Sequence, residues 1–62
     1  MNPTPLSTSV RDAAALTSLS EYEIRNAINK GDLPARKVGR RLVILTDDLR
    51  AWLEALEPAR TA

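Results

Sequence analysis

The fold of this 62-residue chain is decided by residues 20–45, which read SEYEIRNAINKGDLPARKVGRRLVIL. Ser20 and Glu23 form a capping box, in which each side chain bonds the backbone N–H of the other residue. Gly31 stands where a left-handed C-terminal cap would end a helix. Three apolar residues between these signals share one helix face: Ile24, Ala27 and Ile28. The pattern predicts a helix that begins after Ser20 and ends before Gly31.

The segment after Pro34 has a different composition, because β-branched and basic residues surround Gly39. This composition predicts a β-hairpin with strands near residues 35–38 and 42–45. The turn at residues 39–40 fits either a two-residue turn or part of a longer one. The apolar residues leave the register of the two strands open.

Helices are predicted on both sides of this central stretch. Ser9 and Asp12 resemble a capping box with a shorter acid, and apolar residues follow at near-helical spacing as far as Leu16. The last helix is predicted to begin with Thr46 as its N-cap, followed by two aspartates that the helix dipole favours. Its expected core-facing stripe is Leu49, Trp52, Leu53 and Leu56.

Two short helices joined by about three residues make a helix-turn-helix, to which the hairpin adds a wing. We therefore expect an α+β, mainly helical fold: a small winged helix-turn-helix with two N-terminal helices, a β-hairpin wing and a C-terminal helix. The domain is expected over residues 9–57, between a flexible lead-in at residues 1–8 and a tail at residues 58–62. The length allows one domain with a modest core.

Basic charge is concentrated in one third of the chain. Residues 25–45 hold six of the nine Lys and Arg and one of the eight Asp and Glu. This segment therefore carries +5, while the remainder carries −4. Such asymmetry on a near-neutral chain indicates a surface that binds a polyanion, although an alternative is that the charges only solvate a hairpin.

The composition argues against several other functions. The chain has no Cys and no His, which excludes disulfides and thiolate metal sites and removes the usual general base. We predict no enzymatic activity, no catalytic residue, no metal and no cofactor, because so short a chain leaves no room for a substantial pocket. No apolar run approaches the roughly 18 residues of a membrane span. Residues 1–8 lack the features of a signal peptide, so a cytoplasmic location without membrane contact is expected.

The predicted second helix and hairpin carry side chains suited to DNA. Arg pairs bidentately with guanine and Asn with adenine, whereas Tyr and Lys hold phosphates. A basic hairpin tip can enter or flank the minor groove. The candidates on the helix are Tyr22, Arg25, Asn26, Asn29 and Lys30, and those on the hairpin are Arg36, Lys37, Arg40 and Arg41.

Over Val10 to Leu53, 44 of the 62 residues, the chain resembles the excisionase-type winged helix-turn-helix domains related to the MerR regulators. The matching stretches are DAAALTSLSEYEIRNAINKGDLPARKVGRR and DDLRAWL. The resemblance implies that the second helix enters the major groove and the wing contacts the minor groove. It assigns the helix contacts to Ser20, Tyr22, Arg25, Asn26 and Asn29, and the wing contacts to Lys37, Arg40 and Arg41. The chain departs from similar domains at Ser18, where they usually have Gly, so we expect a positive φ there.

Excisionases are recombination directionality factors of phages and plasmids that bind tandem sites cooperatively, bend DNA and direct an integrase towards excision. The resemblance implies this role, with double-stranded DNA, neighbouring copies of the chain and an integrase as partners. MerR regulators use a long helix at the position after Leu56, which this chain lacks, so no small-molecule effector is expected. One alternative is a small transcriptional repressor with the same DNA contacts. Another is a protein-interaction module, such as an antitoxin or adaptor, that docks a partner on its last helix.

Overall fold

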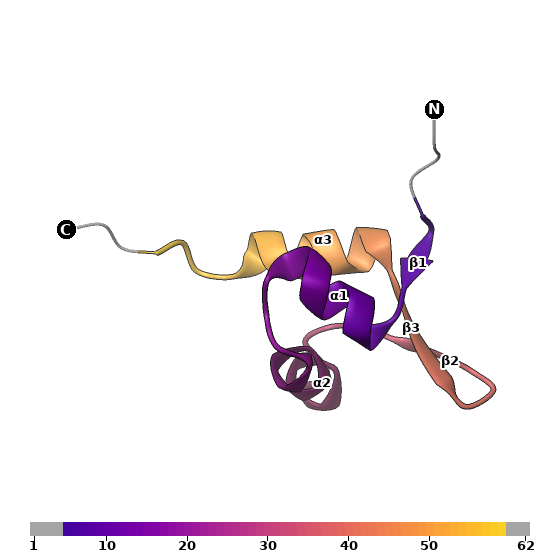
Figure 1. Cartoon of the computed structure of the whole chain (residues 1–62). Coiled ribbons are helices and arrows are strands. Elements are labelled where there is room, and N and C mark those ends of the chain that lie inside the picture. The colour runs from indigo at the N-terminus through magenta and orange to yellow at the C-terminus, as the bar shows by residue number, and fades with distance from the viewer. Residues whose placement is uncertain (1–4, 60–62) are drawn as a thin grey trace.

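Three helices and three short antiparallel strands make up residues 5–59, the part of the chain that the computed structural model describes (Figure 1). The elements are β1 (Ser7–Thr8), α1 (Val10–Thr17), α2 (Glu21–Lys30), β2 (Arg36–Val38), β3 (Arg41–Leu45) and α3 (Thr46–Ala55). Helices α1 and α2 form the expected helix pair, and the β2–β3 hairpin projects from the body of the molecule as a wing (Figure 1). The expected α+β, mainly helical class is confirmed. No helix within residues 5–59 is long and apolar enough to cross a membrane.

Both helices of the pair begin at the caps that the sequence predicts. The Ser9 hydroxyl accepts a hydrogen bond from the N–H of Asp12 at 3.0 Å. At the start of α2 the capping box is complete: the Glu23 N–H donates to the Ser20 hydroxyl at 3.1 Å, and the Ser20 N–H donates to Glu23 Oε1 at 3.3 Å. These bonds satisfy backbone N–H groups that have no partner inside the helix, which explains why both helices start where they do.

The turn between α1 and α2 places a serine in a conformation that usually belongs to glycine. Ser18 has φ +62° and ψ +22°, the left-handed region, as expected from the sequence. The Ser18 N–H donates to the Ala15 carbonyl at 3.4 Å, and the Leu19 N–H donates to the Ala14 carbonyl at 3.1 Å. This closure lets the chain change direction within three residues, so that α2 crosses α1 and packs against it (Figure 1).

The core lies where the helix pair meets β3 and α3. Its three largest fully buried side chains come from three different segments: Ile24, Leu33 and Ile44. Other buried apolar residues complete it, with the partly buried Trp52 packed against them: Val10, Ala13, Ala14, Ala27 and Leu49. The predicted apolar stripe of α3 is wrong at its end, because Leu53 and Leu56 are exposed. Helix α3 ends at Ala55 and the chain then leaves the body (Figure 1), so only the first part of the helix covers the core.

The sheet settles the hairpin register that the sequence leaves open. The strand order is β1-β3-β2, and Val38 pairs with Arg41 across a two-residue turn. Gly39 has φ +60° and Arg40 does not share a positive φ, which matches a type II′ turn with Gly at its first central position. Ile44 is fully buried, so Arg41 and its partner Val38 lie on the opposite face of the sheet, which points away from the core.

Two expectations about the ends of elements are wrong. Residues 1–8 were expected to form a flexible lead-in, but Ser7 and Thr8 form strand β1 and pair with β3. Thr46 was expected to be the N-cap of α3, but it is the first helical residue, and its hydroxyl donates to the Pro5 carbonyl at 2.8 Å. This hydroxyl therefore bonds the segment just before β1 and does not cap the helix. Residues 1–4 of the lead-in and 60–62 of the tail lie outside the described residues.

Candidate nucleic-acid interface

Helix α2 presents one continuous polar stripe to solvent. Its opposite face is held in the core by Ile24 and Ala27, which fixes the rotation of the helix about its axis. The predicted contact residues on the outer side are all exposed, and Tyr22 is exposed by 76%. They are Tyr22, Arg25, Asn26 and Asn29, at positions i, i+3, i+4 and i+7, with Lys30 beside them. Hydrogen-bonding side chains at this spacing can reach base edges together if the helix lies in a groove.

Ser20 is already engaged at the start of this helix. Its hydroxyl accepts from the Glu23 N–H at 3.1 Å and donates to Glu23 Oε1 at 3.2 Å. Both of these bonds would have to be shared or exchanged if Ser20 also contacted DNA. The geometry thus makes Ser20 a residue that orients the N-terminus of α2.

The wing carries four exposed basic residues in two directions. Arg36 and Arg41 lie on the sheet face that points away from the core, because they occupy the same alternation as Val38. Lys37 pairs with Leu42 and therefore lies on the other face, beyond the edge of the core. Arg40 occupies the turn itself. A tip of this kind can present positive charge to both walls of a narrow groove.

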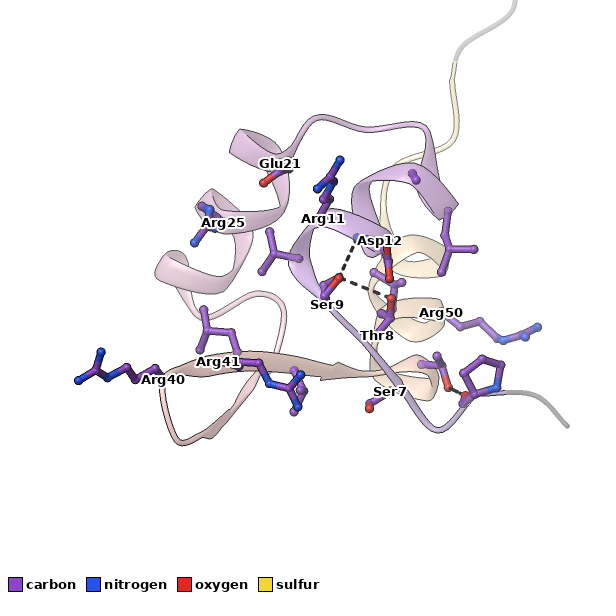
Figure 2. A pocket seen from close by; sticks show the side chains of 18 residues that line it. Ser7, Thr8, Ser9, Arg11, Asp12, Glu21, Arg25, Arg40, Arg41 and Arg50 are labelled. Atoms are coloured by element: carbon purple, nitrogen blue, oxygen red, sulfur yellow. Dashed lines mark hydrogen bonds between the residues drawn. The ribbon is translucent and has the colours of Figure 1, made fainter.

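A broad, open cleft of about 1150 Å³ connects the helix pair, the sheet and α3 (Figure 2), so the expectation that so short a chain has no room for a substantial pocket is wrong. Three predicted contact residues line it: Arg25, Arg40 and Arg41. Two further arginines, Arg11 of α1 and Arg50 of α3, line the same cleft, although neither is predicted as a contact from the sequence. The remaining predicted residues, namely Ser20, Tyr22, Asn26, Asn29, Lys30, Arg36 and Lys37, lie outside its lining.

The cleft has a surplus of positive charge. Its five arginines come from three helices and the wing, and they face two carboxylates, those of Asp12 and Glu21. Hydroxyl groups of Ser7, Thr8 and Thr46 lie along its lining. Arginine and hydroxyl side chains are the groups that most often position a nucleic-acid backbone in protein complexes. The α2 stripe, the wing and this cleft together form the candidate nucleic-acid interface.

Comparison with known families agrees with this geometry. Residues 9–57 match the family model described as a helix-turn-helix domain. The chain belongs to the helix-turn-helix domain family. This is a DNA-binding family that includes excisionase-like proteins, and its members are typically not enzymes. The helix-turn-helix domain described here therefore has DNA as its partner, with α1 and α2 as the helix pair that defines the family. No curated protein and no solved structure matches the chain.

Proposed function

We propose that this helix-turn-helix domain is an excisionase-type architectural protein that binds tandem sites in duplex DNA. In this role it bends the DNA and directs an integrase towards excision. The observation that supports DNA contact most strongly is the arrangement of α2 and the wing. The exposed stripe of α2 and the basic turn of the wing border one arginine-lined cleft, so a single duplex can reach both.

In the proposed complex α2 lies in the major groove. Arg25 pairs with a guanine, and Asn26 and Asn29 pair with adenines, because these side chains match the donor and acceptor pattern of those bases. Tyr22 and Lys30 hold phosphates at the edges of the groove. The wing lies over the adjacent minor groove with its basic residues, which are Arg36, Lys37, Arg40 and Arg41.

The small size of the domain supports binding by several copies. A single module of this kind buries about 600–1,000 Å² on DNA, which gives modest affinity by itself. Contacts between copies on adjacent sites raise occupancy, and head-to-tail contacts can continue along the DNA because they do not close on themselves. Bending 20–30 base pairs by 40–90° costs roughly 1–6 kcal/mol, which several bound copies can offset together.

The first experiment establishes the DNA site. Duplexes selected from a random pool by the purified protein are footprinted, and their affinity is measured from 50 to 200 mM salt. If the basic residues neutralise four to six phosphates, the logarithm of the binding constant should fall with the logarithm of the salt concentration with a slope of about −4 to −5. A flat salt response, or no selected sequence, would overturn DNA binding as proposed and would favour the protein-interaction alternative.

The second experiment tests the architectural role. Gel shifts on duplexes with one, two and three copies of the selected site should show cooperative filling, and circularly permuted fragments should reveal a bend. Addition of the integrase encoded beside such sites should increase excision of the element between them. Independent binding to straight DNA, with promoter occupancy as its effect, would instead support the repressor.

A further inference from the structure

We propose that Arg11 and Arg50 bind phosphates of the DNA backbone, so that the interface extends from α2 and the wing across β1 to α3. This inference rests on the proposed DNA binding and adds a contact surface to it. Neither arginine belongs to the polar stripe of α2 or to the wing. The two are about forty residues apart in the chain.

The spread of the arginines along the cleft indicates an extended ligand. Figure 2 shows Arg25 and Arg40 towards one end, Arg50 at the other end, and Arg11 and Arg41 between them. A small anion would occupy one point of such a surface, whereas a chain of phosphates presents a negative charge at each nucleotide along its length. The cleft is open and continuous with the surface of α2 and the wing, so a duplex held there can place one backbone along it.

The chemistry of the cleft favours phosphate. Arginine presents a planar fork of N–H donors that matches phosphate oxygens, and it keeps its charge at every physiological pH. The exposed side chains of Arg11 and Arg50 can reach a ligand without a change in the core. Two carboxylates, Asp12 and Glu21, leave the cleft positive overall.

Strand β1 joins the N-terminal segment to this surface. Ser7 and Thr8 pair with the end of β3, and the Thr46 N–H donates to the Leu6 carbonyl at 3.0 Å. The Thr46 hydroxyl adds its bond to the Pro5 carbonyl. These contacts join the N-terminal strand to the first turn of α3, one helical turn before Arg50. They therefore support the junction of β3 and α3, from which Arg50 extends.

The test compares salt dependence in single variants on the selected duplex and on a scrambled one. Arg11→Gln and Arg50→Gln should each weaken binding to both duplexes by a similar factor, because phosphates carry no sequence information. Each lost phosphate contact should make the log–log slope shallower by about 0.9, which reduces the increase in Kd between 50 and 200 mM salt by about 3.5-fold. Circular dichroism and thermal melting should show unchanged folding, since both side chains are exposed.

Charge-matched variants separate a local contact from net charge. The double variant Arg50→Gln/Glu57→Gln restores the net charge of the chain, since Glu57 is exposed beyond the end of α3 and outside the cleft. It should remain as weak as Arg50→Gln, and Glu57→Gln alone should have the slope of the wild type. Arg50→Lys should recover most of the slope because it keeps the charge.

The outcomes distinguish this inference from the proposed function. Absence of DNA binding by the wild type would overturn the proposed function itself. Wild-type binding that depends steeply on salt, with Arg11→Gln and Arg50→Gln retaining the same affinity and slope, would overturn the inference alone. Recovery of wild-type binding in the double variant would overturn it as well, because net charge would then account for the effect.

Discussion

Replacement of Ser18 by glycine should stabilise this domain without changing its DNA contacts. Ser18 occupies the left-handed region at φ +62°, and it is exposed in the turn between α1 and α2. The hydrogen bonds that close this turn are made by the backbone N–H groups of Ser18 and Leu19, which glycine at position 18 preserves. The substitution therefore removes a strained Cβ and leaves the turn intact.

The expected magnitude follows from two opposing terms. The left-handed conformation costs a residue with a Cβ roughly 1–2 kcal/mol. Glycine gives back about 0.4–1 kcal/mol because it gains conformational freedom in the unfolded chain. The midpoints of these two ranges leave a net stabilisation of about 0.8 kcal/mol. For a domain of this size each kcal/mol raises Tm by about 4–8 °C.

Thermal and urea unfolding of three variants tests this reasoning. Ser18→Gly should raise Tm by about 2–8 °C. Ser18→Ala keeps the Cβ and removes only the hydroxyl, so its Tm should stay near the wild-type value. Gly31→Ala makes the opposite change at the C-cap of α2, because it adds a Cβ to a residue with a positive φ. There φ is +85° and the added Cβ would meet no atom within 4 Å. It should lower stability by about 0.5–1 kcal/mol through conformation alone.

Two results would refute the argument. A lower Tm for Ser18→Gly would mean that the serine side chain stabilises the turn by more than its conformation costs. An unchanged Tm for Gly31→Ala would show that the left-handed region carries no penalty in this protein. Affinity for the selected duplex should be the same for Ser18→Gly and the wild type, and a loss would place residue 18 in the interface.

Three further predictions concern the interface and its supports. Arg25→Ala should lower discrimination between the selected and a scrambled duplex by about 1–3 kcal/mol, and an equal loss on both duplexes would contradict its base contact. Arg40→Ala should weaken binding to both duplexes. Ser20→Ala removes the capping box of α2 and should cost about 0.5–2 kcal/mol in urea unfolding, so an unchanged midpoint would argue against the cap. Thr46→Val removes the hydroxyl that bonds the Pro5 carbonyl and should lower the free energy of unfolding by about 0.5–1.5 kcal/mol. An unchanged free energy of unfolding would contradict this role of the hydroxyl.

The helix pair could be predicted from the sequence because its signals are local. The capping box joins Ser20 and Glu23 across three residues, and Gly31 ends α2 through its own backbone conformation. The positive φ of Ser18 was expected for a different reason, namely that domains similar to this chain usually have Gly at the position. The outward stripe of α2 follows once its apolar face is known, since a helix has one rotation that buries Ile24.

Other features depended on partners that are distant in the chain. The hairpin register was decided when Ile44 was buried against the helices, because a shift of one residue would have moved it to the opposite face. The strand at residues 7–8 is too short to have a period of its own, and it exists because β3 offers an unpaired edge. Leu53 and Leu56 fit an apolar stripe, but the last turn of α3 and the residue after it lie past the core that would have covered them.

The sequence by itself determined the helix pair, the basic hairpin and the side chains that α2 presents to solvent. Only the tertiary structure decided that Arg11 and Arg50 share a cleft with Arg25 and the wing. Caps and helix faces arise from interactions within a few residues, so the order of residues is enough to specify them. The cleft arises from β1 pairing with β3 and from the Thr46 bonds to the N-terminal segment, which join residues about forty positions apart.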